Sequence, residues 1–354
     1  MPRTAAYAAL SATSKLVPFA LDRRLPGVRD VVIEILFCGV CHSDYHYVSG
    51  EWGDVPYPAV PGHEIVGRVL ETGSSVAAFR AGDLVAVGCL VDSCRICDAC
   101  AASEEQYCVD QWAGATYGGT EKQTGRPTHG GYSKRIVVDE HFVLRVPPGL
   151  DPAGVAPLLC AGITTYSPLR HWHAGPGSTI GVVGLGGLGH MAIKLASAMG
   201  AEIVLFTTSP GKAEDARRLG ATETVVSTDR DAMARHARRL DLIIDTVSAP
   251  HDLDPYLTLL KRDGTLVLLG LPPTPHPPTT AALFVNGRIN LAGSLIGGLR
   301  ETQQMLDFCA MHGIVSDIEM VRMDEIDAAF ARMLRGDVKY RFVIDMATLS
   351  DRDR

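Results

Sequence analysis

A short glycine run, Gly184-Leu-Gly186-Gly-Leu-Gly189, constrains the fold of this chain more than any other feature. The β-branched segment Thr179–Val183 precedes the run, and a helical segment opening at Leu188 follows it. In that setting the glycines permit a tight turn, close approach of a pyrophosphate and close packing of helix on strand. The start of the helix offers free backbone N–H groups to an anion. The run therefore predicts a dinucleotide site.

Segments predicted as strands alternate with segments predicted as helices from residue 179 onward. The expected strands are 179–183, 202–207, 241–246, 265–269 and 289–295, and the expected helices are 188–199, 212–219 and 253–261. Such alternation needs a parallel sheet with crossover helices. We therefore expect an α/β domain with a doubly wound parallel sheet, a Rossmann domain, over residues 156–294.

The first 155 residues instead contain short β-branched segments between glycines and prolines, which predicts a β-rich domain over 1–155. The expected strands are 5–10, 31–37, 65–70, 83–87 and 134–138. In the tail, helices are expected at 302–312 and 325–334, with a strand at 340–344. Because that last strand has no partner nearby in the sequence, we expect 295–354 to return to the first domain.

Charge and cysteine usage exclude several classes of protein. The net charge of −7 argues against nucleic-acid or anionic-membrane binding. We find no apolar run near the ~20 residues of a membrane helix and no secretory signal, which predicts a cytoplasmic protein. Nine cysteines in such a chain favour metal binding over disulfides. Cys38, Cys89 and Cys309 lie in apolar surroundings, and we expect them to be small buried hydrophobes.

Four of the cysteines, Cys94, Cys97, Cys100 and Cys108, lie within the segment of about 90–110. The spacing Cys-x2-Cys-x2-Cys-x7-Cys can wrap a tetrahedral zinc ion and leaves no open coordination position. Two disulfides or four unrelated thiols are the alternatives, and both fit regular spacing in a cytoplasmic protein poorly. The sequence therefore predicts a structural zinc lobe.

A second potential metal site is dispersed along the chain. Cys41, His63 and Cys160 form the Cys₂His set of an open catalytic zinc, which acts as a Lewis acid on an alcohol or carbonyl oxygen. Glu64 either ligates the zinc transiently or lies beside it. Asp44 is a candidate to hold the remaining N–H of the His63 imidazole.

Alcohol–carbonyl interconversion also needs a path for a proton. Ser43 follows a zinc ligand by two residues, so its hydroxyl can face the reacting oxygen. His46, with an ordinary pKa of about 6.5, can pass the proton outward. A solvated surface histidine is the simpler alternative for His46.

The end of the second strand of the nucleotide domain indicates which dinucleotide binds. Enzymes that use NAD place an acidic residue there, about 20 residues after the glycine run. This chain instead has Thr207, Thr208 and Ser209, followed by Lys212. Hydroxyls and an ammonium suit a 2′-phosphate, which a carboxylate would repel. The sequence favours NADP(H), with capping of the next helix as the alternative role of 207–209.

Together these motifs resemble the zinc-containing medium-chain alcohol dehydrogenases, in particular the cinnamyl alcohol dehydrogenase branch and its bacterial broad-specificity NADPH-dependent aldehyde reductases. The resemblance covers essentially the whole chain. The motifs that carry it are Gly39-Val-Cys-His-Ser-Asp44, Val60-Pro-Gly-His-Glu-Ile-Val-Gly67, the four-cysteine lobe, Pro157-Leu-Leu-Cys-Ala-Gly-Ile-Thr-Thr-Tyr166, Gly184–His190 and Arg335-Gly-Asp-Val-Lys-Tyr-Arg-Phe-Val-Ile344.

The resemblance implies a GroES-like catalytic domain, a Rossmann domain, two Zn²⁺ per chain and NADP(H). It implies Cys41, His63, Cys160 and Glu64 as ligands of the catalytic zinc, and Ser43 and His46 as the proton relay. Cofactor contacts are implied at Ser43, Thr164, Gly184, Leu185, Gly186, Gly187, Leu188, Gly189, Thr207, Thr208, Ser209, Lys212, Thr246, Gly270, Ser294, Leu295 and Ile296. Trp52, Trp112 and Ile296 are candidates for the substrate cleft.

The implied function is reversible reduction of aliphatic and aromatic aldehydes to primary alcohols by a cytoplasmic homodimer, without nucleic-acid or membrane partners. One rival is an NAD-linked alcohol or polyol dehydrogenase, which the missing acid after the second strand disfavours. The other is a catalytically idle zinc protein that binds NADPH. A complete relay and an open metal site argue against an idle protein.

Overall fold

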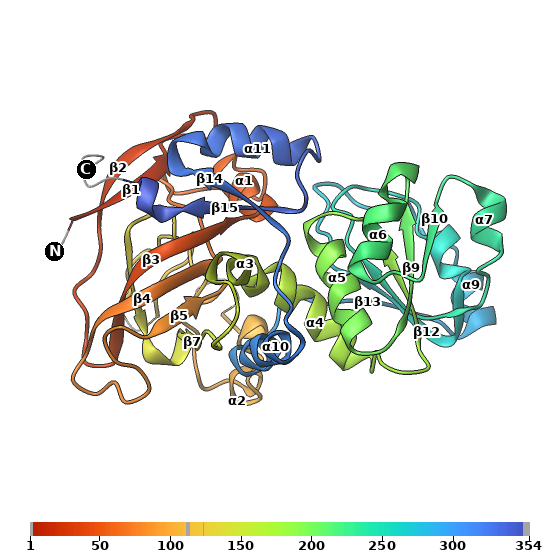
Figure 1. Cartoon of the computed structure of the whole chain (residues 1–354), viewed down its shortest axis with the longest axis horizontal. Coiled ribbons are helices and arrows are strands. Elements are labelled where there is room, and N and C mark those ends of the chain that lie inside the picture. Colours follow the sequence, from red (N-terminus) through yellow and green to blue (C-terminus); the bar gives the residue numbers. More distant parts are fainter. Residues whose placement is uncertain (1–2, 111–113, 123, 350–354) are drawn as a thin grey trace. The chain divides into compact units, whose positions relative to one another are not determined.

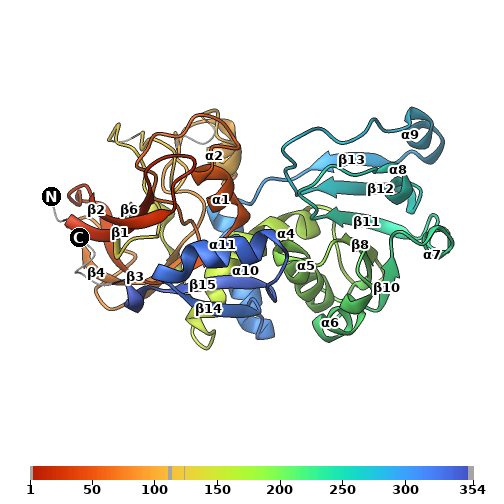
Figure 2. The same cartoon turned by 90° about the horizontal axis from the view of Figure 1, so that it is seen from above.

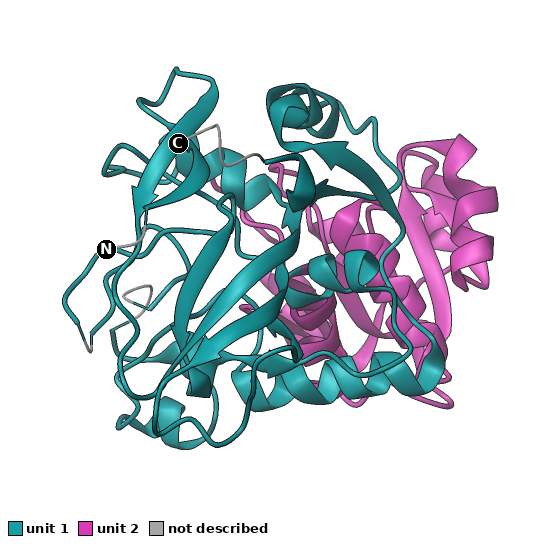
Figure 3. Ribbon diagram, turned by 60° about the vertical axis from the view of Figure 1, so that its left-hand side comes forward, with its two compact units in different colours: residues 1–160, 297–354 teal, residues 161–296 magenta. Residues whose placement is uncertain are grey.

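The computed structural model describes residues 3–110, 114–122 and 124–349, so Trp112 lies outside the described residues. The chain forms two compact units, Met1–Cys160 with Gly297–Arg354, and Ala161–Ile296. Figure 3 shows that both ends of the chain build the first unit, while a single continuous segment builds the second. No helix in the described part of the chain is long and apolar enough to cross a membrane.

The second unit is built on a six-stranded parallel sheet. Its strands are β8 (Thr179–Val183), β9 (Glu202–Thr207), β10 (Glu223–Val226), β11 (Leu240–Asp245), β12 (Leu260–Leu268) and β13 (Asn290–Gly293), in the order β10-β9-β8-β11-β12-β13 (Figure 2). Strand order reverses between β8 and β11, as in a doubly wound sheet. The central strands are apolar and buried, because helices cover such sheets on both faces. The expected Rossmann fold is confirmed.

The helices of this unit connect its strands. They are α4 (Ala161–His171), α5 (Gly187–Ala198), α6 (Ala213–Leu219), α7 (Arg230–Ala234), α8 (Asp254–Leu257) and α9 (Ala281–Gly287), with a 3₁₀ turn, η4, at Pro210–Lys212. The helix expected at 253–261 is wrong in length. It ends at Leu257, and Leu260 begins β12 opposite Leu240. The apolar run 257–260 is compatible with helix or strand, and pairing with β11 decides for the strand.

The first unit contains a mostly antiparallel sheet that the tail of the chain completes. Its strands are β3 (Asp30–Val40), β4 (Ile65–Thr72), β5 (Leu84–Val87), β6 (Arg135–Asp139), β7 (Leu144–Arg145), β14 (Ile318–Arg322) and β15 (Arg341–Asp345), and β1 (Arg3–Ala9) pairs separately with β2 (Leu16–Asp22). The tail strand β15 pairs parallel with β14 and antiparallel with β3, with Phe342 opposite Val40 (Figure 1). The tail therefore places Arg341 beside the end of β3.

Helices of different lengths connect the strands of this unit. They are α1 (His42–Val48), α2 (Asp98–Ala101), α3 (Pro152–Val155), α10 (Leu299–His312) and α11 (Ile326–Leu334), with 3₁₀ turns η1 (Glu105–Tyr107), η2 (Glu140–Phe142), η3 (Ala156–Leu159), η5 (Met323–Glu325) and η6 (Met346–Thr348). Cys41 lies in the sequence between the end of β3 and the start of α1, and Cys160 directly follows the end of η3.

Candidate active site

The dispersed group of metal-type side chains comes together inside the first unit. Ligand atoms of Cys41, His63, Glu64 and Cys160 all lie within 4.8 Å of one another, and all four residues are buried. Two of the segments meet because β3 and β4 pair antiparallel, and the Gly39 N–H donates to the Glu64 carbonyl at 2.9 Å. The pairing carries Cys41 and His63 to the same end of the sheet.

A fully buried carboxylate, Asp44, orients this group. It accepts N–H groups from Cys41 at 2.9 Å and Gly62 at 3.0 Å, and its Oδ1 lies 3.2 Å from Nδ1 of His63. The hydroxyl of Tyr132 also donates to it, at 3.3 Å. Asp44 thus holds the His63 ring by Nδ1 and leaves Nε2 for a metal, the arrangement typical of metal-binding histidines. The sequence makes Asp44 a candidate for this role, with a surface carboxylate as the alternative, and its full burial excludes the alternative.

Tyr117 is a second neighbour of the His63 ring, and no motif in the sequence marks it. Its hydroxyl lies 3.1 Å from His63 Nδ1, and its ring lies 5.5 Å from the imidazole, centroid to centroid. It reaches the site from the long loop before β6. Together with Asp44 it fixes the orientation of the ligand ring.

Glu64 has one carboxylate oxygen paired and the other free. Oε1 accepts from the buried guanidinium of Arg341, and Oε2 has no hydrogen-bond partner among the described residues. Burial raises the pKa of Glu64 well above its ordinary value, while the charge of Arg341 opposes that rise. An added Cβ at Gly39 would lie 1.9 Å from Oε2, so only glycine leaves room for the carboxylate there.

Arg341 is a site residue that sequence analysis missed. It lies in the tail motif Arg335–Ile344, which contributes to the family resemblance but implies no role for this arginine. Residue 341 lies 277 positions from Glu64, so nothing local in the sequence links them. Only the pairing of β15 with β3 brings this cation to the metal-type group.

The sulfur atoms complete a donor set suited to zinc. Sγ of Cys41 and Sγ of Cys160 lie 3.8 Å apart. A hydrogen bond from Cys160 holds the pKa of Cys41 well below its ordinary value, although burial opposes this, and the charge of Arg341 favours the same thiolate. Two sulfurs, one imidazole and an unpartnered carboxylate oxygen match the ligands of an open zinc site.

Cys89 corrects an expectation from the sequence. It is partly exposed rather than a fully buried hydrophobe. A hydrogen bond from Cys160 lowers its pKa, against the effect of burial, so a third sulfur lies beside the metal-type group. Its apolar neighbours in the sequence concealed this, because Cys160 approaches from 71 residues further along the chain. Cys38 and Cys309 are buried as expected.

The expected relay residues lie on α1. Ser43 Oγ is 3.5 Å from Cys41 Sγ, and His46 follows one helical turn later on the same face. Nδ1 of His46 lies 2.5 Å from Oε2 of Glu51, and the ring stacks on Trp52 with 5.0 Å between centroids. His46 is therefore a held side chain rather than a freely solvated one. Glu51 was not anticipated.

The four-cysteine lobe forms a second metal-type group, which is less buried. Ligand atoms of Cys94, Cys97, Cys100 and Cys108 lie within 4.8 Å of one another. The cysteines are free thiols, so the disulfide alternative does not hold. Backbone N–H groups of Cys97 and Cys94 donate to the sulfurs of Cys94 and Cys108, each at 3.3 Å. Such contacts stabilise thiolates.

In the second unit, the glycine turn has the geometry of a pyrophosphate cradle. Gly184 has φ +88°, which favours glycine, and a Cβ on Gly189 would lie 2.1 Å from the Gly184 carbonyl oxygen. At Gly186, the N-cap of α5, an added Cβ would meet open space. A phosphate can therefore approach the backbone at Gly186, as well as Leu185, Gly187 and Leu188 around it.

The expected 2′-phosphate residues begin at the last residue of β9 and continue into the turn after it. Oγ1 of the buried Thr207 accepts the Ser209 N–H at 3.2 Å, Thr208 lies between them, and Lys212 Nζ donates to the Leu185 carbonyl at 2.9 Å. Partial burial lowers the pKa of Lys212. The Ser209 side chain does not cap the 3₁₀ turn that follows. The ammonium thus lies beside the glycine turn, and its acceptor there is a neutral carbonyl.

Apart from Ser43, which lies on α1 of the first unit, the remaining expected cofactor residues come from other segments of the same unit. Thr246 donates to the Val183 carbonyl at 2.7 Å, beside the glycine turn. Gly270 packs on residue 247, because a Cβ added to Gly270 would lie 2.2 Å from the carbonyl oxygen of residue 247. Residues Ser294–Ile296 follow β13 at the carboxyl edge of the sheet, where such folds bind ligands, whereas Thr164 lies in α4.

Comparison with known proteins places these features in a family. Residues 27–148 match the alcohol dehydrogenase GroES-like domain, and residues 187–311 match the zinc-binding dehydrogenase domain. The chain is 58% identical over 347 residues to aldehyde reductase YahK of Escherichia coli (98% of this chain, 99% of that protein). It is 53% identical over 349 residues to NADP-dependent alcohol dehydrogenase C 1 of Mycolicibacterium smegmatis (99% of each).

Comparison with solved structures leads to the same family. The cinnamyl alcohol dehydrogenase SbCAD4 of Sorghum bicolor superposes with a TM-score of 0.95 at 45% identity, over 99% of each chain. CAD from Helicobacter pylori, solved with NADP(H), gives 0.92 at 40% identity, over 98% of this chain and 99% of that one. With two metal-type groups, a glycine turn and relatives of this identity along its whole length, the chain belongs to the zinc-containing medium-chain alcohol dehydrogenase family, in its cinnamyl alcohol dehydrogenase branch.

Proposed function

We propose that this protein is a zinc-dependent oxidoreductase that reduces aldehydes, aliphatic and aromatic, to primary alcohols with NADPH, reversibly. The assembled set of Cys41, His63 and Cys160 beside an unpartnered oxygen of Glu64 carries the proposal. Relatives named as an aldehyde reductase and as NADP-dependent alcohol dehydrogenases support it.

Cys41, His63 and Cys160 would hold the catalytic zinc, and Glu64 is the candidate for an additional ligand. A zinc ion in such a site polarises a carbonyl oxygen and favours an alkoxide over an alcohol near neutral pH. Arg341 competes for Glu64, because it already pairs with Oε1. Glu64 can therefore offer only Oε2 without breaking that pair.

The side chains of α1 would move the proton. In the reductive direction Ser43 donates to the oxygen of the new alcohol, and His46 resupplies that proton from outside. Glu51 holds the His46 ring by Nδ1, so Nε2 is the nitrogen left for the exchange. The stacking of His46 on Trp52 keeps the ring from turning away.

NADP(H) would bind to the second unit. The glycine turn and the first turn of α5 suit the pyrophosphate, and Thr207–Ser209 with Lys212 suit the 2′-phosphate. Lys212 needs only to exchange the neutral Leu185 carbonyl for a phosphate oxygen, which is the stronger acceptor. Thr164, Thr246, Gly270 and Ser294–Ile296 are the further candidate contacts.

Several finer statements belong to the same proposal. The lobe cysteines would hold a second, structural zinc, which gives two ions per chain. The protein would act on small-molecule substrates as a cytoplasmic homodimer without a nucleic-acid partner. The support for these points is the chemistry of the lobe, the acidic net charge of −7 and the family resemblance.

The test is the loss of reduced-nicotinamide absorbance with cinnamaldehyde and benzaldehyde, with NADPH and NADH side by side. We expect fast turnover with NADPH and little with NADH. Preference for NADH would overturn the 2′-phosphate assignment and favour an NAD-linked alcohol or polyol dehydrogenase. No turnover with either cofactor, in a protein that still binds NADPH, would favour an idle binder.

Lys212→Ala tests the cofactor pocket separately. A charge-assisted hydrogen bond contributes about 1.5–3 kcal/mol, so we expect NADPH affinity to fall by about tenfold to a hundredfold. Affinity for NADH, which lacks the 2′-phosphate, should change by less than about twofold. Equal losses for the two cofactors would contradict the assignment.

A further inference from the structure

An ion pair between a buried carboxylate and a partly exposed histidine, at the carboxyl end of β11, has no part in the chemistry above. Asp245, the last residue of β11, is 1% exposed, and its Oδ2 lies 3.0 Å from Nε2 of His251. Its other oxygen, Oδ1, accepts the Val247 N–H at 3.0 Å. The pair therefore joins the two ends of the segment 246–250 into a closed loop.

His251 faces an acceptor on each ring nitrogen. Nδ1 lies 2.9 Å from the Ala249 carbonyl oxygen, while Nε2 faces the Asp245 carboxylate. Nε2 and the Asp245 Oδ2 atom meet at 3.0 Å without forming a full hydrogen bond, so their attraction is mainly Coulombic. A neutral imidazole has one N–H, so either tautomer would set a nitrogen lone pair against an oxygen. Only the imidazolium suits both neighbours.

The groups around this ring agree with a held cation. Asp245 raises the pKa of His251 above its ordinary 6.5, with Asp252 adding to the rise, while partial burial opposes it. Tyr256 of α8 and His276 of the loop after β12 meet the ring edge-on, at 5.8 and 4.9 Å between centroids. His276 Nδ1 also lies 3.3 Å from the His251 backbone N. The charged neighbours are thus carboxylates, which favour the protonated ring.

The loop closed by this pair packs on the glycine turn. A Cβ on Gly184 would lie 3.1 Å from Oγ1 of Thr246 and 3.1 Å from Cγ2 of Val247. A Cβ on Gly270 would lie closer still, 2.2 Å from the Val247 carbonyl oxygen. Any displacement of 246–250 would therefore disturb the backbone that surrounds the expected pyrophosphate position.

We propose that protonated His251 is a positioning residue for the dinucleotide site, which holds the segment 246–250 against the glycine turn through its pairing with Asp245. This inference rests on the proposed binding of NADP(H) to the second unit. The pair opens when His251 loses its proton. NADPH affinity therefore falls as the pH rises.

The direction follows from linkage. Because the pKa of His251 is raised in the folded protein, the contribution of the pair is complete below the ordinary value of 6.5. It is lost as the pH rises through the raised value. The pair therefore contributes at acidic pH, and its contribution is lost at a pH above 6.5. A purely structural contact would not show this pH dependence.

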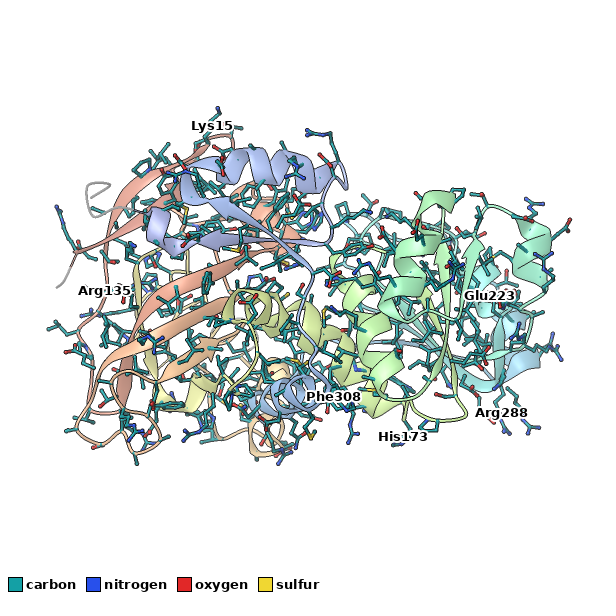
Figure 4. All side chains as sticks on the ribbon, viewed as in Figure 1. Lys15, Arg135, His173, Glu223, Arg288 and Phe308 are labelled. Carbon is teal, nitrogen blue, oxygen red and sulfur yellow. The ribbon has the colours of Figure 1, made fainter. Side chains whose placement is uncertain are left out.

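The experiment titrates the full-length protein with NADPH, followed by cofactor fluorescence, at steps between about pH 6 and about pH 9. His251→Asn is compared with wild type and with His173→Asn. His173 is an exposed residue of the same unit (Figure 4), with φ +56°, where asparagine is well tolerated. At about pH 6 we expect His251→Asn to weaken binding about tenfold, and at about pH 9 to match wild type within about twofold. His173→Asn should follow wild type throughout.

Two results would overturn the proposal. One is a His251→Asn protein that is shown to be folded by its thermal unfolding transition and whose NADPH affinity depends on pH as in wild type. The other is an NMR titration of the cofactor-free protein in which the His251 resonance, assigned by its absence from His251→Asn, titrates at or below the ordinary pKa. If His251→Asn fails to fold, Asp245→Asn serves in its place and should lower the pKa of His251. Wild type that binds no NADPH at any pH would reject the cofactor assignment itself, and this inference with it.

Discussion

The lobe group of four cysteines and the dispersed group of Cys41, His63, Glu64 and Cys160 offer similar atoms in opposite surroundings. The lobe draws its ligands from 15 consecutive residues, three of them half-buried. The dispersed group draws on residues 41–160 and is buried throughout, and one of its carboxylate oxygens has no hydrogen-bond partner in the part of the chain that the structure describes. The lobe supplies four ligands from one short segment, which leaves no coordination position open. The dispersed group is open, and its residues come together only through the fold. We therefore propose that the dispersed group carries the chemistry and that the lobe contributes stability.

Removing a dispersed ligand should have the largest effect. With Cys41→Ser we expect turnover to fall by about a thousandfold or more, because a Lewis acid supplies several kcal/mol of transition-state stabilisation. Zinc content should drop to about one ion per chain while NADPH still binds, because the glycine turn belongs to the other unit. Turnover near the wild-type rate would reject the zinc mechanism.

Asp44→Asn should have the next largest effect. The substitution keeps the shape of the side chain but removes the charge that faces His63 Nδ1. We expect zinc affinity or turnover to fall by about 10–100-fold, the usual loss when such a partner of a metal-binding histidine is removed. Zinc affinity is measured by competition with a chelator, together with turnover. Tyr132→Phe, which removes only one donor to Asp44, is the control and should lose less than about threefold. Equal losses would mean that Asp44 acts only through packing.

Gly39→Ala tests the room kept for Glu64. The new methyl group would lie 1.9 Å from Oε2, and the carboxylate cannot retreat easily because Arg341 holds its other oxygen. Overpacking of this kind costs about 1–3 kcal/mol, so we expect roughly a tenfold loss of turnover. Gly175→Ala, where the nearest atom is 3.7 Å away, is the matched control. If both variants behave like wild type, Glu64 has no role that depends on its present position.

A lobe substitution should have the smallest effect on chemistry. Cys100→Ser should leave turnover at low temperature within about twofold of wild type, but lower Tm by roughly 5–10 °C through loss of a structural zinc. The lobe also anchors α10, since Glu105 accepts the Leu299 N–H at 3.0 Å, so exchange of α10 amides should quicken. A folded Cys100→Ser protein as inactive as Cys41→Ser would remove the distinction between the two groups.

Local patterns predicted the fold class well and the limits of elements less well. The glycine turn, the alternation after residue 179 and the lobe are readable because each depends on neighbours in the chain. The helix expected at 253–261 failed because residues 257–260 fit two periods, and the sheet chose between them. Strand β10 and helix α7 were not anticipated, since each is at most five residues long and carries little periodicity.

The residues of the candidate active site also fall into those that a sequence pattern marks and those that it does not. Cys41, His63, Glu64 and Cys160 were proposed from residue types, and the structure brings them together. Arg341, Tyr117, Glu51 and Cys89 had no pattern to mark them. Each acts by touching a side chain whose position depends on strand pairing or loop packing, which no spacing in the sequence encodes.

The sequence by itself determined the ligand types, the closed lobe, the glycine turn and the absence of an acid after β9, because these features are set within one or two turns of chain. Only the tertiary structure decided which groups meet. It placed Arg341 against Glu64, Cys89 beside Cys160, and His251 between Asp245 and the Ala249 carbonyl. Charge and hydrogen bonding act over a few ångströms, so their effect at a site depends on how strands from distant parts of the chain pair.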